Sequence, residues 1–219
     1  MKAKRVLKAN VTEGNADRFT EICRTAAQFF YEKGFDATSV SDIADAMKLT
    51  KAALYYYIEG KQELLFEIMN RGMDALEREV IAPAEMAADA NARLEAIIHN
   101  HARQIATGNH AVTIISDEVS ALTAAQRKKI TARRRAYFDF VRITLDELKT
   151  EGKLHDVDTT VAAFSVVGMI LWVSRWYQPG GSLTPDDVSR EISKIAFNAL
   201  LSPTSINEKR NTKNERRTN

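Results

Sequence analysis

Three observations predict that this chain of 219 residues is all-α. Apolar residues recur three or four positions apart along most of the sequence, which is the period of a helix with one buried face. No segment of any length shows the strict alternation of a strand, and no internal repeat is present. Glycine and proline stand where several helical segments end. With 45% hydrophobic residues, the chain can bury a good core as one large domain or two small ones.

The first predicted helix has an inward stripe of apolar side chains, formed by Phe19, Ile22, Ala26, Phe29 and Phe30. Cys23 flanks this stripe and is expected to be a small packed side chain. Because it is the single cysteine, no intramolecular disulfide can form, which favours a reducing compartment such as the cytoplasm.

Residues 38–61 predict two short helices separated by a tight turn. Ser39 suits the N-cap of the first helix, and Asp42 three positions later completes a capping box. Lys48 and Leu49 form the turn, and Thr50 caps the second helix. The first of these helices turns four apolar side chains inward, namely Val40, Ile43, Ala44 and Met47.

The second short helix has two faces left for solvent or a partner. Leu54 and Ile58 are four positions apart and point into the core. Lys51 with Tyr55, and Ala52 with Tyr56, occupy the remaining faces. A purely structural helix rarely exposes adjacent tyrosines, whereas small residues and polar tips suit a helix that enters a DNA major groove. Lys61 then opens the next helix at its positive end, where an anion is expected.

This segment resembles the DNA-binding domain of the TetR family of bacterial transcriptional regulators. The clusters that carry the resemblance are residues 34–39, 42–44, 50–51, 54–56 and 61–64, within a match over roughly residues 18–66. It implies DNA contacts at Ser39, Ser41, Thr50, Lys51, Ala52, Tyr55, Tyr56, Tyr57 and Lys61. Three positions depart from the pattern, since Lys48 and Ala52 stand where glycine is frequent and Ile58 replaces a usual phenylalanine. Ala52 affects which operator sequence fits rather than binding itself.

The rest of the chain is predicted to be helical. The expected segments are residues 61 to about 80, ended by Pro83; 90–107, ended by Gly108; 110–122; 124–151, ended by Gly152; 158–177, closed by residues 179–181; and a last helix to about Leu201, capped by Thr184 with Pro185 at its first position.

Two of these helices are expected to form a homodimer. Residues 161–173 are apolar around the whole helix, so one core contact cannot cover them. The expected interface residues are Phe164, Val167, Leu171, Val188, Ile192, Ile195 and Ala199. The resemblance also implies dimerisation through the last two helices, and hence an inverted-repeat operator. The alternative is that these faces form the internal core of a monomer.

The middle helices are expected to hold an effector pocket. His101 lies on an inward stripe, and Arg134 stands in an apolar row, where a guanidinium needs a partner. A hydrogen-bonded core histidine, and an Arg134 paired with Asp117 or Glu118, are the structural alternatives. Residues 175–181 resemble a motif of TetR regulators whose effectors are CoA thioesters. The candidate pocket residues are His101, Ile114, Arg134, Phe138, Met169 and Trp172, and each also suits a core position.

Charge and motifs restrict the class of protein. The net charge is +2, and residues 1–67 hold ten basic and ten acidic side chains, so a DNA-binding surface must gather its positive charge locally. No nucleophile elbow, phosphate loop, metal-ligand spacing or catalytic carboxylate pair is present, so no enzyme, cofactor or metal site is predicted. The longest uncharged run has 16 residues, short of the roughly 20 needed to span a membrane.

The predicted organisation is a basic flexible arm (1–17), a DNA-binding domain (18–66), a helical effector-binding and dimerisation domain (67–201) and a polar disordered tail (202–219). The predicted function is a cytoplasmic, homodimeric repressor that a small molecule, such as an acyl- or aryl-CoA thioester, releases from double-stranded DNA. The alternatives are an activator with the same helix-turn-helix, or a small-molecule-binding helical protein.

Overall fold

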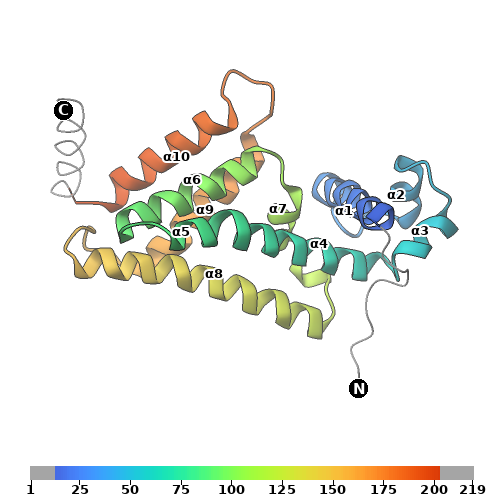
Figure 1. Ribbon diagram of the computed structural model, residues 1–219, viewed down its shortest axis with the longest axis horizontal. Coiled ribbons are helices and arrows are strands. Elements are labelled where there is room, and N and C mark those ends of the chain that lie inside the picture. Colours follow the sequence, from blue (N-terminus) through green and yellow to red (C-terminus); the bar gives the residue numbers. More distant parts are fainter. Residues whose placement is uncertain (1–12, 203–219) are drawn as a thin grey trace. The chain divides into compact units, whose positions relative to one another are not determined.

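The computed structural model describes residues 13–202, with side chains from residue 15 onward. Its elements are α1 (Glu13–Lys33), α2 (Val40–Ala46), α3 (Lys51–Tyr57), α4 (Lys61–Leu76), η1 (Glu77–Ile81), α5 (Ala82–Glu85), α6 (Ala90–Ala106), α7 (His110–Asp117), η2 (Val119–Ala121), α8 (Ala124–Thr150), α9 (Thr159–Trp176) and α10 (Pro185–Leu200) (Figure 1). Across these residues the extended pairing is limited to one isolated bridge, between Leu154 and Leu201. The all-α prediction is confirmed.

The chain forms two compact units. The first unit combines residues up to 75 with residues 109–133, and the second combines residues 76–108 with those from 134 onward. Compactness therefore places α7 and the start of α8 with the N-terminal helices, whereas the sequence suggested a single change of domain at residue 67. The arm predicted for residues 1–17 overlaps α1, which begins at Glu13. Its first twelve residues, and the tail from 203, lie outside the described part.

The core of the first unit follows the predicted stripes. Phe19, Ile22, Ala26 and Phe30 of α1 are buried, as are Ile43 and Ala44 of α2, Leu54 of α3 and Ile58 after it. Cys23 is buried too, and this burial raises the pKa of its thiol to about 12. The thiol therefore acts as a packed side chain, as expected.

The local signals between α1 and α3 hold. Ser39 and Asp42 form both bonds of the capping box, and the Thr50 side chain accepts the Ala53 N–H at 3.1 Å. Lys48 in the turn has a φ of +54°, a left-handed conformation that glycine adopts without steric cost. This backbone agrees with the glycine that the resemblance leads one to expect at this position.

Helix α4 lies very close to α7. A Cβ atom built on Gly72 would stand 2.5 Å from the carbonyl oxygen of Ala111 and 2.8 Å from Cδ1 of Ile115. Such distances are repulsive, so any larger residue at 72 forces the two helices apart. Helix α7 itself ends at Asp117, earlier than the predicted residue 122, and the single 3-10 turn η2 follows it.

The expectation that Pro83 ends a helix is wrong. Helix α4 passes into the π-helical turn η1, and α5 continues to Glu85 with Pro83 in its first turn. The Ala82 N–H donates to the carbonyl of Glu77, five residues earlier. Proline lacks an N–H, and its ring crowds the carbonyl four residues before it. A wider turn just before the proline relieves that crowding, so the helical path survives.

In the second unit, α6 packs against α9 and α10. The predicted helix boundaries of this unit are confirmed. Gly108 after α6 and Gly152 after α8 have φ values of +79° and +69°, and Thr184 caps the start of α10 through a capping box with Asp187. Helix α9 has 18 residues and a mean hydropathy of 1.3, and one third of it is buried. By length and composition alone it meets the test for a membrane-spanning helix, which the 16-residue uncharged run did not suggest.

Replacing Lys48 by glycine should stabilise the protein. Glycine adopts a φ of +54° without the clash of a Cβ atom, and the expected gain is about 1 kcal/mol in the free energy of unfolding. Urea denaturation measures it. The matched control is Lys48→Ala, which removes the same charge but keeps the Cβ atom and should bring no gain. Equal midpoints for both variants would contradict a strained turn.

Candidate DNA-binding face and effector region

Helix α3 presents a polar and aromatic face to solvent. Lys51 and Ala52 are exposed, and Tyr55 and Tyr56 are 41% and 54% exposed, respectively. Leu54 is fully buried and fixes the opposite side of the helix. Helix α3 contains no acidic residue. The exposed face therefore combines a positive charge, two phenolic hydroxyls and a small residue, without an acid on the same helix.

Flanking positions extend this face. Thr50 and Ser39 are exposed, and Ser41 is half-buried. The Ser39 side chain accepts the Asp42 N–H at 3.1 Å, while the Asp42 carboxylate accepts the Ser39 N–H at 2.7 Å. The hydroxyl of Ser39, and next its backbone N–H, interact with this carboxylate and hold the pKa of Asp42 below its usual value, so Asp42 stays a carboxylate and keeps its capping role.

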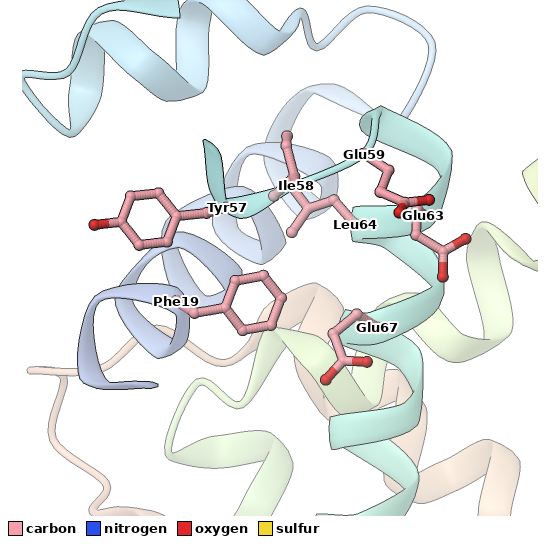
Figure 2. Close-up of a pocket in the computed structure, with 7 residues that line it drawn as sticks. All are labelled: Phe19, Tyr57, Ile58, Glu59, Glu63, Leu64 and Glu67. Atoms are coloured by element: carbon pink, nitrogen blue, oxygen red, sulfur yellow. The ribbon is translucent and has the colours of Figure 1, made fainter. Parts of the chain in front are cut away.

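Tyr57 departs from the predicted contact set. It is half-buried, and its ring meets the edge of the Tyr56 ring with centroids 5.2 Å apart. It borders a shallow depression in the first unit, and its ring extends away from the three glutamates on the other side of that depression (Figure 2). The depression is lined by Phe19, Tyr57, Ile58, Glu59, Glu63, Leu64 and Glu67. Three consecutive tyrosines on a helix cannot share one face, and Tyr57 lies on the side that turns inward.

Lys61 also differs from its predicted role. Its Nζ donates to the carbonyl oxygens of Phe35 at 2.8 Å, Thr38 at 2.9 Å and Asp36 at 3.4 Å. The same ammonium lies 4.2 Å from the centre of the Phe35 ring. An ammonium has three protons to donate, so these carbonyls use its capacity. Lys61 fastens the connection between α1 and α2 to the start of α4 instead of projecting outward.

Three more hydrogen bonds tie the α7–α8 connection to the DNA-binding helices, all within the first unit. The Phe35 N–H donates to Glu118 Oε1 at 3.0 Å. Gln62 Nε2 donates to the Ala121 carbonyl at 2.6 Å. Gln126 Nε2 donates to Glu63 Oε2, also at 2.6 Å. Glu118, considered from the sequence as a partner for Arg134, thus serves the end of α1. Sequence reasoning missed these ties because no spacing pattern relates residues so far apart.

The second unit contains a buried polar pair. His101 of α6 is 2% exposed and Tyr137 of α8 is 3% exposed. His101 Nδ1 lies 2.8 Å from the Tyr137 hydroxyl, and the rings meet edge to face with centroids 5.4 Å apart. Burial lowers the pKa of His101 to about 4 and raises that of Tyr137, so both side chains are neutral near pH 7. His101 therefore faces inward, as predicted, with a partner at one nitrogen.

The other candidate pocket residues differ in burial. Trp172 is 66% exposed, so it does not line an enclosed wall of the second unit, and its role in a pocket stays a prediction. Phe138 and Met169 are half-buried, and Ile114 is buried in the first unit. Arg134 is half-buried and desolvation lowers its pKa, while no ion pair is recorded for it among residues 15–202. The guanidinium thus remains a candidate anion contact.

An exposed apolar face covers part of α9 and α10. Val161, Phe164 and Trp172 of α9 are 64%, 58% and 66% exposed, and Ile195 of α10 is 55% exposed. Ala199 is exposed and Leu171 is half-buried. These residues form the apolar face discussed below. It contains four residues of the predicted interface, namely Phe164, Leu171, Ile195 and Ala199.

Three predicted interface residues lie inside the second unit instead. Val167, Val188 and Ile192 are 2%, 2% and 9% exposed. The buried side of α10 is centred on Ser189, Ser193 and Ala196, which a search for large apolar residues overlooks. Both serine hydroxyls donate to helix carbonyls, at 3.0 Å and 2.8 Å, so burial leaves their donors satisfied. Small side chains there allow α10 to pack against α6.

Family profiles match both regions of the chain. Residues 22–68 match "Bacterial regulatory proteins, tetR family", and residues 87–200 match "Tetracyclin repressor-like, C-terminal domain". The HTH-type transcriptional repressor KstR2 of Rhodococcus jostii (strain RHA1) is 33% identical over 201 residues, which are 89% of this chain and 97% of that protein. KstR2 of Mycobacterium tuberculosis (strain ATCC 25618 / H37Rv) is 28% identical over 82% of this chain and 91% of that protein.

Solved structures agree. A crystal structure of AibR in complex with isovaleryl coenzyme A and operator DNA is 34% identical, with a TM-score of 0.75, and covers 82% of this chain and 98% of that chain. The ketosteroid transcriptional regulator KstR2 of Mycobacterium tuberculosis has the same fold, with a TM-score of 0.79 over 90% of this chain and all of that chain at 24% identity. The two family matches and the similarity to KstR2 show that this chain belongs to the TetR family of bacterial transcriptional regulators.

Proposed function

We propose that this protein is a cytoplasmic repressor that binds an inverted-repeat operator as a homodimer and leaves it when a CoA thioester binds. The observation that carries the DNA-binding part is the exposed face of α3, where Lys51, Tyr55 and Tyr56 stand beside Ala52 with no acid on the helix. Its relative KstR2 is a transcriptional repressor, which favours repression over activation for this protein.

The residues of this face have distinct roles in the proposal. Lys51 contacts a phosphate, and Tyr55 and Tyr56 donate hydroxyls to phosphates or base edges. Ala52 allows close approach to the groove. Thr50, Ser39 and Ser41 add hydroxyls at the margin of the face. Lys61 acts as a positioning residue, because its ammonium is bonded to carbonyls of residues 35–38.

The apolar face supports a homodimer. Trp172, Phe164 and Val161 are each more than half exposed, and their spacing puts them on one side of α9. An exposed apolar helix face of this kind favours an interaction site. A two-fold contact covers the same face on both copies and places two α3 helices on one duplex. Helix α9 also has the length and composition of a membrane-spanning helix. A measured dimer that depends on this face would favour the dimer interface over a membrane span.

The effector class rests on three observations. AibR, a solved relative, was crystallised with isovaleryl coenzyme A. In this chain Arg134 is a half-buried cation with no ion pair recorded among residues 15–202, which suits the phosphates of CoA. Residues 175–181, with Arg175 in the last turn of α9, resemble the motif of CoA-responsive regulators. Binding must favour the non-DNA-binding state energetically, since equal affinity for both states shifts nothing.

Binding to an inverted-repeat duplex tests the proposed function. With DNA from upstream of its own gene, fluorescence anisotropy should show tight binding at low salt and a steep loss of affinity between about 50 and 200 mM salt. Saturating isovaleryl-CoA should weaken that binding by at least about tenfold, whereas free CoA should not. AibR was crystallised with effector and operator together, so the two can be bound at the same time in a relative. If the thioester binds this protein and its affinity for DNA does not change, the proposed release by the effector is refuted, but operator binding is not. No preference for the inverted repeat would refute the operator.

Lys51 and Lys61 should separate DNA contact from positioning. Lys51→Ala should reduce the slope of log affinity against log salt by about 1 and leave stability unchanged, because it removes one exposed phosphate contact. Lys61→Met should lower the free energy of unfolding by about 1–3 kcal/mol, because the part-buried carbonyls of Phe35 and Thr38 lose the charged donor that they share. Urea denaturation and anisotropy give both quantities. If the Lys61→Met protein is as stable as the wild type and only its slope of log affinity against log salt is reduced, Lys61 contacts DNA and is not a positioning residue.

Trp172→Glu should break the dimer. A carboxylate in the centre of an apolar two-fold contact meets its symmetry copy and loses hydration, so sedimentation should show a folded monomer with weakened operator binding. The control is Met86→Glu, at a position that is 86% exposed and outside α9 and α10, which should remain dimeric. A Trp172→Glu dimer of unchanged strength would place the interface elsewhere.

A further inference from the structure

His101 has a second nitrogen without a partner. Nδ1 lies 2.8 Å from the Tyr137 hydroxyl, whereas Nε2 is buried and has no hydrogen-bond partner among the described residues. The residues on the same stripe of α6 are apolar and buried, namely Leu94, Ile97, Ile98 and Ile105. Asn91 and Gln104 are also buried polar side chains of α6. His101 is the polar member of the stripe that these four apolar residues form.

The hydrogen-bond pattern fixes which nitrogen carries the proton. A neutral imidazole has one N–H, and a phenol can donate or accept. If the Tyr137 O–H donates to Nδ1, the phenol is satisfied and the proton of His101 is on Nε2. If Nδ1–H donated instead, the phenol proton and the Nε2 lone pair would both lack partners. Since buried polar groups are rarely left unsatisfied, the arrangement with one orphan is favoured. Nε2 is then a buried donor.

A buried donor without an acceptor destabilises the protein, and such groups persist where a ligand supplies the acceptor. The imidazole geometry directs Nε2 away from Nδ1, and so away from Tyr137 of α8. A ligand that entered beside this stripe would meet apolar side chains, and one oxygen on its apolar group would accept from Nε2–H. The complementary chemistry is a hydrocarbon acyl or ring group that carries a carbonyl or hydroxyl oxygen.

We infer that His101 Nε2–H is the donor that selects an oxygen-bearing effector: the effector's acyl group carries an oxygen acceptor at its buried end, and Tyr137 holds the imidazole in the required tautomer. This inference rests on the proposed function, since it names the chemistry of the effector that the second unit binds. It assigns His101 a specificity role that a packed core histidine does not have.

The test uses two small probes of equal shape, cyclohexanone and methylenecyclohexane, so that it does not depend on CoA. Only cyclohexanone has an oxygen acceptor. NMR of protein labelled with ¹⁵N-histidine should show the His101 proton on Nε2 in the free protein and a downfield shift of its signal with cyclohexanone alone. Binding of cyclohexanone should be at least about fivefold tighter than binding of methylenecyclohexane, as expected for one hydrogen bond to an otherwise unpaired group.

Three variants separate specificity from packing. The double variant His101→Leu/Tyr137→Phe removes both polar groups, so it should be at least as stable as the wild type in urea and should bind both probes equally. His101→Gln keeps an N–H donor near the position of Nε2 and should retain a preference for cyclohexanone. His99→Leu, two positions along α6, should leave the preference unchanged.

The outcomes are distinct. Equal binding of both probes by the wild type, no binding of either, or a proton on Nδ1 would each overturn the assignment of His101. A preference that survives in the double variant would do the same. Unchanged operator binding with both isovaleryl-CoA and 4-oxopentanoyl-CoA, whose acyl chain carries a ketone, would instead overturn the CoA part of the proposed function. With the cyclohexanone preference intact, His101 would remain the donor.

Discussion

One ammonium group holds the DNA-binding helices on α4. Helix α1 ends where Gly34 takes a φ of +82°, and the short connection to α2 leaves carbonyls without helical donors. Lys61 supplies those donors from the first residue of α4, at 2.8 Å to Phe35 and 2.9 Å to Thr38. A neutral side chain cannot serve several carbonyls in this way. The capping box of α2 begins directly after Thr38, so the exposed face of α3 depends on a contact that neither α2 nor α3 makes.

What the sequence predicts well is local. The caps at Ser39, Thr50 and Thr184, and the glycine at 152, depend on residues within four positions of one another, and each is found. What it predicts badly depends on distant partners. Lys61 stands at the start of a helix, which suggests that it binds an anion, but its ammonium donates instead to carbonyls of residues 35–38. Pro83 breaks most helices, yet the π-helical turn before it absorbs the conflict. Val188 and Ile192 are apolar enough for an interface, but small serines beside them let α6 cover that side.

The second unit contains two departures from ordinary packing, a polar atom inside and aromatic rings outside. They are connected. The His101 ring meets Tyr137 at 5.4 Å, Tyr137 meets Phe138 at 6.2 Å, and Phe138 stacks on Phe164 at 4.4 Å. Phe164 is 58% exposed on the apolar face. Rings in contact cannot reorient independently at protein packing density. A ligand that turns the imidazole therefore displaces side chains up to the surface where a second copy is proposed to dock.

In the first unit the α7–α8 connection is where a small displacement has the largest effect. Glu118 binds the end of α1 through Phe35 N–H, Ala121 accepts from Gln62, and Gln126 donates to Glu63. Each such bond contributes roughly 0.5–1.5 kcal/mol, and more where a carboxylate takes part. Shifting a two-state equilibrium from 1:99 to 99:1 needs about 5.5 kcal/mol. Three bonds that form or break together supply much of that, whereas one would not. The three bonds involve Glu118, Ala121 and Gln126, which lie within nine residues of chain. A displacement of this segment would therefore break them as a set, and with them the hold of the first unit on residue 35 and on the first turn of α4.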